Sequence, residues 1–228
     1  MKIQGTLLGV GIAKPPAGPG VAYQIVSPAN TVANLTWLAR ETRRWQSEVE
    51  GFIDQGLPSV VIHRAEFGVD VLASIAESLR VNGCCNVVTV DLEGNLLAAA
   101  SYFIAAPEGY LNLVVIEPRH LVGSPGTNQL RGLGTSLVAA MGHEMVRKGV
   151  AAVYLHPLDD AAWQFWRGRG FKICGRGGLS CLRGTQAVER LIDGCRVEDD
   201  PQRGEVVLCG IPQQVRAYRV PRSYKRSL

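Results

Sequence analysis

The sequence predicts a mixed α/β fold of the α+β kind, in which helices flank a central, mostly antiparallel sheet. Three strand-like runs at residues 86–91, 96–105 and 110–117 are separated only by short breaks that contain glycine. Such breaks join antiparallel neighbours, so these runs are expected to form a meander. Helical spacing resumes at 133–148, and the apolar run 151–155 that follows is typical of a strand covered on both faces.

Residues 1–56 are expected to form an N-terminal extension ahead of the main domain. Residues 14–20 read KPPAGPG, which can propagate neither a helix nor a central strand, and we interpret them as a linker. Apolar residues between Val32 and Ile53 then recur at spacings of three and four, which predicts an amphipathic helix capped by Asn30 or Thr31.

The main domain is expected to span residues 57–211, with a basic tail at 212–228. Its remaining predicted elements are a strand at 60–62, helices at 71–79, 159–167 and 185–193, and strands at 171–175 and 205–211. The tail carries basic residues and no acidic one (Arg216, Arg219, Arg222, Lys225 and Arg226). Such a run indicates either a solvated tail or contact with RNA or another polyanion.

Composition excludes several classes of protein. The 228 residues are 46% apolar and 19% charged, with 26 glycines and 12 prolines, which excludes collagen, a coiled coil and a disordered chain. The net charge of +4 is too small to indicate a nucleic-acid partner by itself. No apolar run approaches the length needed to span a bilayer, so no membrane association is expected.

Cysteine usage predicts a reducing environment. The six cysteines contain no C-x-x-C pair and none at the histidine spacing of a zinc site, so no metal is expected (Cys84, Cys85, Cys174, Cys181, Cys195 and Cys209). A chain of this size does not need disulfides, and we therefore expect free, mostly buried thiols and a cytoplasmic location.

The segment from Tyr110 to Phe171 carries the clearest signs of chemistry. A strand ends at 116–118, and the run QLRGLG at 129–134 opens a helix. Glycine lets the backbone approach a ligand closely, and a helix N-terminus offers unpaired N–H groups and a positive dipole end. The junction therefore predicts an anion site suited to pyrophosphate, although no Gly-Lys-Ser/Thr follows as in a Walker loop.

These residues resemble the signatures of the GNAT superfamily, the Gcn5-related N-acetyltransferases. Gln129-x-x-Gly132-x-Gly134 matches the Q/R-x-x-G-x-G/A motif, and Ile116-Glu117-Pro118 is similar to the V-x-P element that ends the family's fourth strand. Downstream, Ala162, Gly170 and Phe171 match the element N-x-x-A-x-x-x-Y-x-x-x-G-F at the right spacing.

The resemblance implies an N-acetyltransferase that uses acetyl-CoA as cosubstrate. An amine of a small molecule or protein would attack the thioester directly, which requires positioning, donors for the oxyanion and proton transfer. The strand end would bind the pantetheine and thioester carbonyl, and the helix start would hold the pyrophosphate. The implied cofactor contacts are Val114, Val115, Ile116, Gln129, Leu130, Arg131, Gly132, Leu133, Gly134, Thr135 and Trp166.

Two departures from the family pattern bear on the chemistry. The interval from Pro118 to Gln129 is longer than usual, and the insert at 119–128 either reshapes the acceptor mouth or bulges into solvent. Trp166 stands where the family commonly has a tyrosine general acid, and an indole N–H is no proton-transfer acid at neutral pH. Another residue then protonates the thiolate, the thiol leaves unassisted, or the chemistry has been lost.

Glu117 and His156 are the candidate general bases, with His120 in the insert as a further one. Glu117 follows the strand beside the expected thioester, and His156 ends the next strand. Their ordinary interpretations are a solvated strand-end carboxylate and a strand-end residue before Pro157. Histidine titrates near neutral pH without any perturbation, which suits a base.

Two other functions stay open at this point. A catalytically silent acyl-CoA-binding or interaction module is suggested by Trp166, and an acetyltransferase for an RNA-linked amine by the basic tail. Association into a homodimer is also a reasonable expectation, because the fold leaves sheet edges to protect.

Overall fold

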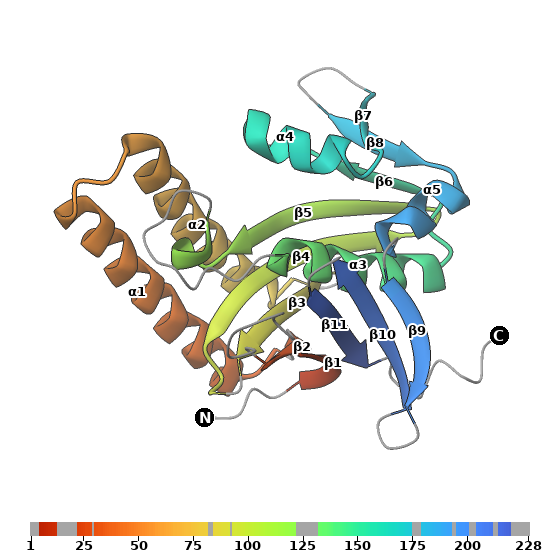
Figure 1. Ribbon diagram of the computed structural model, residues 1–228, viewed down its shortest axis with the longest axis horizontal. Coiled ribbons are helices and arrows are strands. Elements are labelled where there is room, and N and C mark those ends of the chain that lie inside the picture. Colours follow the sequence, from red (N-terminus) through yellow and green to blue (C-terminus); the bar gives the residue numbers. More distant parts are fainter. Residues whose placement is uncertain are drawn as a thin grey trace.

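The computed structural model describes residues 5–12, 22–28, 30–81, 84–91, 93–121, 132–174, 179–192, 195–200, 204–211 and 214–219. Side chains are described for Pro28 and, within these ranges, for residues 30–192 except Ser136. In this part of the chain, eight strands form one sheet in the order β1-β2-β3-β4-β5-β6-β8-β7, and three form a second sheet in the order β11-β10-β9 (Figure 1).

The central strands confirm the predicted mixed, mostly antiparallel sheet. β3 (Cys84–Asp91), β4 (Leu96–Ala105) and β5 (Glu108–Ile116) form the expected antiparallel meander. β6 (Ala152–Leu155) then pairs parallel to β5, and β8 (Ser180–Arg183) pairs antiparallel to β6. The parallel step needs a crossover, which α3 (Leu133–Arg147) provides.

The first 56 residues contribute to this sheet and to its core. β1 (Gly5–Ile12) pairs with β2 (Ala22–Pro28), which pairs with β3, and neither strand was predicted. The predicted helix is confirmed as α1 (Val32–Asp54), where the Thr31 hydroxyl accepts a hydrogen bond from the Asn34 N–H. The expected boundary at residue 56 stays a prediction, and it falls between two helices of one core. The linker 14–20 lies outside the described residues.

The predicted strand at 60–62 is wrong, because these residues open helix α2 (Ser59–Ser78). Val61 is buried and Val60 is 55% exposed, which fits one side of a helix whose buried face continues through Ala65 and Leu72. The β-branched run suggested a strand, but packing against α1 and the sheet overrides that local propensity.

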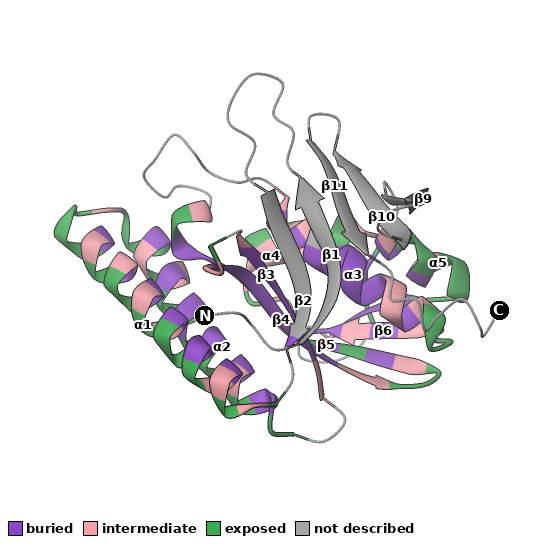
Figure 2. Ribbon diagram, turned by 90° about the horizontal axis from the view of Figure 1, so that it is seen from below, coloured by how far each residue is buried: buried purple, intermediate pink, exposed green. Residues whose placement is uncertain are grey.

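Two hydrophobic cores lie on opposite faces of the sheet, and β4 contributes to both. Leu96 and Ala99 pack with α1 and α2, whereas Leu97 and Ala100 pack with α3. Buried residues follow one side of α1 and α2 and fill β3 and β4 (Figure 2). Helix α4 (Asp160–Arg167) joins the α3 side through Trp166, which is 7% exposed.

The remaining elements depart from the prediction mainly at their ends. The strand expected at 171–175 is reduced to β7 (Lys172–Ile173), and the helix at 185–193 divides into α5 (Thr185–Glu189) and η3 (Arg190–Ile192). β10 (Gly204–Ile211) confirms the last predicted strand, while β8 and β9 (Cys195–Asp200) were not predicted. β11 (Gln214–Arg219) lies within the segment interpreted as the tail.

The described residues also bear on membrane association and on the state of the cysteines. None of the helices there is long and apolar enough to cross a membrane. Four of the six cysteines are free thiols (Cys84, Cys85, Cys174 and Cys181), and the side chains of the other two lie outside the described part. A cytoplasmic location stays a prediction.

We expect two glycine-to-alanine substitutions in helices to act in opposite directions. A Cβ at Gly142 in α3 would lie 2.7 Å from the Cβ of Leu191, so the helix and η3 would have to separate. A Cβ at Gly51 in α1 would lie 3.9 Å from its nearest neighbour, the Nε2 at the end of the flexible Gln55 side chain. Gly51→Ala should therefore stabilise the fold by about 1 kcal/mol, and Gly142→Ala should destabilise it by about 1–2 kcal/mol. Urea unfolding midpoints measure both, and a Gly142→Ala variant as stable as the parent would contradict this close packing.

Candidate functional site

The sheet opens between β5 and β6, and the candidate site is built around this opening. The two strands pair only from Glu108 to Tyr110 on β5 and from Ala152 to Tyr154 on β6. β5 continues to Ile116, and none of the described strands pairs with that side of it beyond Tyr110 (Figure 1). Its outward backbone N–H and C=O groups are therefore available to an extended ligand that carries amides, as at a sheet edge.

A β-bulge lies at the point where the opening begins. Ser101 of β4 is opposite Leu113, and Tyr102 is opposite Leu111, so Asn112 is the extra residue of β5. The Asn112 side-chain amide donates to the Ser101 hydroxyl across the bulge, at 3.4 Å. A bulge bends its strand and increases the local twist, which turns β5 away from the line of β6.

Past the bulge, the side chains of β5 alternate between the two cores. Val114 and Ile116 pack toward α3, whereas Val115 packs toward α2, where a Cβ at Gly68 would lie 3.2 Å from it. These three residues, predicted as cofactor contacts, are thus held by packing on both faces. Their backbone is the part that faces the opening.

The N-terminus of α3 lies against the end of β5. Its cap residue Gly132 has a φ of 76°, a conformation that favours glycine, and offers no side-chain hydrogen bond to the first turn. A Cβ at Gly134 would lie 3.2 Å from the Cδ1 of Ile116, so a side chain there would press on β5. The first-turn N–H groups from Leu133 to Thr135 therefore lie beside the opening with no acidic residue near them on the helix. Gln129, Leu130 and Arg131 lie outside the described residues.

Arg169 brings a positive charge to this helix start. Its Nη2 donates to the Thr135 hydroxyl at 2.7 Å, its Nη1 donates to the Phe165 carbonyl at 3.0 Å, and its guanidinium lies 3.5 Å from the centre of the Phe165 ring. Burial lowers the pKa of Arg169 to about 10. No described carboxylate forms an ion pair with it. A fixed and partly desolvated guanidinium without a carboxylate partner is suited to an anionic ligand.

Trp166 is a core residue on the other side of this aromatic group. Its ring makes edge contacts with Phe165 and Phe171, with centroids 4.9 and 5.4 Å apart. Phe165, rather than Trp166, approaches the helix start, since its ring lies 3.7 Å from the Cβ position of Gly134. A cofactor contact by Trp166 stays a prediction.

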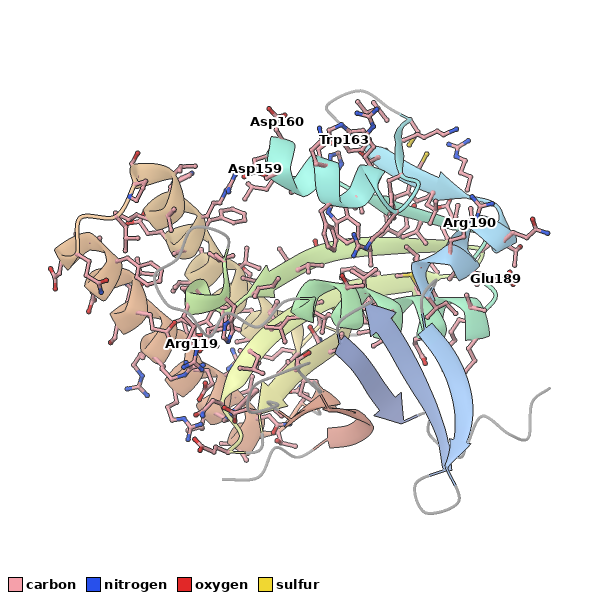
Figure 3. The ribbon with its side chains drawn as sticks, viewed as in Figure 1. Arg119, Asp159, Asp160, Trp163, Glu189 and Arg190 are labelled. Carbon is pink, nitrogen blue, oxygen red and sulfur yellow. The ribbon has the colours of Figure 1, made fainter. Side chains whose placement is uncertain are left out.

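Glu117 is buried in an ion-pair network and not solvated at a strand end. Its fully buried carboxylate pairs with Arg44 of α1, with Arg119 at 2.8 Å, and lies 3.2 Å from the His120 Nε2. Arg119 and His120 belong to η1 (Pro118–His120), and Figure 3 shows Arg119 beside α1. Burial alone would raise the pKa of Glu117, but the hydrogen bonds from His120 and Arg44 and the nearby positive charges outweigh it and lower the pKa to about 2.

Three carboxylates of this network share one arginine. Arg44 donates to Glu41, Glu48 and Glu117 and also to the Leu96 carbonyl of β4, at 2.7 Å. Glu41 is fully buried and accepts the Leu96 N–H at 3.0 Å. Burial, followed by the charge of Glu117, raises the pKa of Glu48 to about 7. The network therefore fixes α1 to β4 and to the start of the inserted segment.

His156 lies on the other side of the opening. It is exposed and directly follows β6, two residues after Tyr154, so the strand alternation directs it to the face that carries Tyr154. The structure thus separates the two predicted bases, one exposed at the end of β6 and one buried beneath α1. A carboxylate with a pKa of about 2 holds a proton poorly at neutral pH, so His156 is the better suited of the two.

An ion pair connects the helices on the two faces of the sheet. The Arg64 Nε of α2 lies 3.0 Å from the Asp159 Oδ2, and Asp159 also caps α4 by accepting the Ala162 N–H at 2.7 Å. Figure 3 shows Asp159 at the end of α4 nearer to α2.

In the part of the chain that the structure describes, no group of three or more His, Cys, Asp or Glu side chains could hold a metal ion.

Solved acetyltransferases are among the structures that match this one. A putative acetyltransferase from Exiguobacterium sp. 255-15 is 19% identical, with 73% of this chain and 96% of that chain covered and a TM-score of 0.45. PaiA N-acetyltransferase from Thermoplasma acidophilum, in complex with coenzyme A, is 16% identical over 70% and 98% of the two chains, with a TM-score of 0.42. The ribosomal-protein-S18-alanine N-acetyltransferase from Escherichia coli is 19% identical over 50% and 72%, with a TM-score of 0.36.

The chain is similar in fold to these acetyltransferases. No protein-family model matches the chain, and no curated protein matches it in sequence.

Sequence reasoning missed Arg169, Arg44 and Glu48. Arg169 and Arg44 act through partners that are distant in sequence, since 34 residues separate Arg169 from Thr135 and 73 separate Arg44 from Glu117. Glu48 joins the same network through Arg44. One available signal was the helical pattern of α1, which places Glu41 and Glu48 on its buried side among apolar residues. Charged residues on an apolar helix face usually have partners.

We expect Glu48→Gln to flatten the pH dependence of stability. Because the folded state raises the pKa of Glu48 from 4.5 to about 7, it retains a proton that the unfolded chain releases. This contribution is complete below pH 4.5 and is lost as the pH rises through 7. Between about pH 5 and pH 8, wild type should lose on the order of 1 kcal/mol more than Glu48→Gln, after allowance for solvent screening.

Urea unfolding at the two pH values tests this expectation. Glu50→Gln, at an exposed position on the same helix, is the matched control and should follow wild type. Identical pH profiles for wild type and Glu48→Gln would show that Glu48 does not titrate in this range.

Proposed function

We propose that the protein is an N-acetyltransferase that transfers the acetyl group of acetyl-CoA directly to an amine. One observation carries the proposal: β5 and β6 separate after Tyr110 and Tyr154, and the uncapped start of α3 lies against the end of the same β5. An extended chain with amides can pair along β5 there, while its anionic end reaches the helix N-terminus. Pantetheine joined to a pyrophosphate has this combination of groups.

The residues of the helix start suit such a ligand. The position of Gly134 leaves β5 and α3 close enough for one ligand to touch both, and the N–H groups of Leu133 to Thr135 supply donors. Arg169 adds a charge that no described carboxylate neutralises. The predicted contacts at Gln129 to Arg131 remain part of the proposal.

The acceptor amine would react on the face of the sheet that carries His156. The neutral amine forms a C–N bond to the thioester carbonyl carbon, the C–S bond breaks, and the nitrogen releases a proton. His156 takes that proton in the proposal because it is exposed beside the opening. Glu117 is a positioning residue for the start of the insert, since its carboxylate already pairs with Arg44 and Arg119.

The leaving thiolate has no tyrosine acid at the position of Trp166. The indole is packed between two rings and carries no acidic proton, so the thiol leaves without its help. The same observation favours a second candidate function, a silent acyl-CoA-binding module. Binding and turnover distinguish these two candidates. An RNA-linked amine as acceptor rests on the tail, whose side chains lie outside the described residues.

We expect Arg169→Gln to weaken acetyl-CoA binding about tenfold, because it removes the charge beside the helix start. Arg167→Gln, exposed at the end of α4 two residues before Arg169, is the matched control and should bind as wild type does. Calorimetry with acetyl-CoA and with acetyl-pantetheine, which lacks the phosphates, separates a charge effect from a damaged site. Equal acetyl-CoA affinity in all three proteins would contradict the phosphate site.

We expect His156→Gln to lower kcat by about 10²-fold, because the base is lost. Acetyl-CoA affinity should not change, and His63→Gln, exposed on α2, should behave as wild type. The measurement is thiol release from acetyl-CoA over a panel of amines as a function of pH. Full activity of His156→Gln would refute the role of His156, and tight binding with no turnover of any amine would favour the silent module.

A further inference from the structure

An acidic and aromatic group lies on the exposed sheet face where β5 and β6 separate. Tyr110 and Tyr154 are opposite each other as the last paired residues of the two strands. Their rings are stacked, with centroids 5.2 Å apart and planes 21° apart. Both hydroxyls donate to Glu108, one to each carboxylate oxygen, and the bond from Tyr154 is 3.3 Å long. We call these three residues the tyrosine–glutamate site.

The tyrosine–glutamate site faces away from the α3 core. Leu111 and Val153, the strand neighbours of the two tyrosines, are buried in that core, so the tyrosine rings point to the opposite face. On that face α1 and α2 pack on β3, β4 and the far end of β5, and their core includes no residue of β6, β7 or β8. Tyr110 is accordingly 41% exposed.

Glu108 has no cationic partner among the described residues. The ion pairs of the described part do not include it. The nearest arginine in the strand register is Arg183 of β8, which is opposite Ala152, and Ala152 is opposite Glu108. Two strand spacings, about 10 Å, separate the backbones of the two charged residues, and the Arg183 charge acts on Tyr154 of the site rather than forming an ion pair with Glu108. Two phenol groups hold the Glu108 carboxylate in place.

We infer that the tyrosine–glutamate site binds a second, non-reacting ammonium group of the acceptor. A carboxylate framed by aromatic rings attracts an ammonium through charge and through the faces of the rings. Because both hydroxyls are held by Glu108, the rings and the carboxylate are ordered before binding, which reduces the entropy that binding costs. The inference rests on the proposed function and names its acceptor class as a compound with two amines.

The position of the site fits this role. His156 lies two residues beyond Tyr154 on the same face, and Glu108 is level with Ala152. Ala152 and His156 are four residues apart, which is about 13 Å along a strand. The side chains of Glu108 and His156 can extend toward each other and shorten this distance. One end of an extended diamine can then meet the thioester while its other end meets Glu108. A monoamine of the same length gains nothing from the site.

The test compares 1,6-diaminohexane with hexylamine as acceptors for wild type and for Glu108→Gln. In wild type, kcat/KM should be about tenfold higher for the diamine, chiefly through KM. Glu108→Gln keeps the shape of the side chain but removes its charge, so the ratio should fall to near one. One tyrosine hydroxyl can still donate to the amide oxygen, while the other accepts from the amide nitrogen. Glu189→Gln changes the net charge equally on α5, on the other face (Figure 3), and should keep the wild-type ratio. An unchanged ratio in Glu108→Gln would overturn the inference.

Binding without acetyl-CoA separates this inference from the proposed function. The tyrosine ring resonances of wild type should shift on titration with 1,6-diaminohexane, and Glu108→Gln should need about tenfold more diamine for the same shift. Equal titrations would refute the site whether or not the protein acetylates amines. Diamine binding that depends on Glu108, without acetylation of any amine, would refute the proposed function and leave the site in place.

Discussion

The candidate site depends on one constraint, which is that β5 pairs with β4 along its length but with β6 over only three residues. The bulge at Asn112 makes this arrangement possible, because it bends β5 while leaving its pairing with β4 intact on either side. Backbone groups that an ordinary sheet would use internally then face an opening. The start of α3, Arg169 and His156 acquire their relation to one another only because they surround it.

The buried charges anchor the C-terminal end of β5, where the opening lies. Arg44 joins Glu117 to two carboxylates of α1 and to the backbone of β4, so three segments distant in the sequence meet at one guanidinium. Burying these groups costs free energy that their mutual pairing has to offset. The gain is a fixed origin for the segment that follows η1, at the cost of a carboxylate that could otherwise have served as a base.

Local patterns predicted the elements whose packing agrees with their intrinsic preference. β4 has its predicted bounds, and β3, β5, α3 and α4 lie where spacing and glycine breaks indicated. The strand predicted at 60–62 failed because three β-branched residues suit either a strand or the buried side of a helix. β2 was missed because its partner in the main sheet is β3, more than fifty residues later, and β1 was missed with it because it pairs only with β2. The Gly132 and Gly134 positions were predictable, since a strand-to-helix junction is itself a local pattern.

By itself the sequence determined the fold class, the sheet meander and the glycine-bearing helix start, because hydrophobic period and glycine placement are local properties. Only the tertiary structure decided which charged groups are available for chemistry. Glu117 is buried among partners from α1 and η1, whereas His156 is exposed. Arg169 donates to Thr135 at the start of α3, and Glu108 accepts hydrogen bonds from two tyrosines. The electrostatic environment of a group depends on the charges and hydrogen bonds that are close to it in space. Glu108 and Tyr154 are 46 residues apart in the sequence, so their contact could not be predicted from the sequence alone.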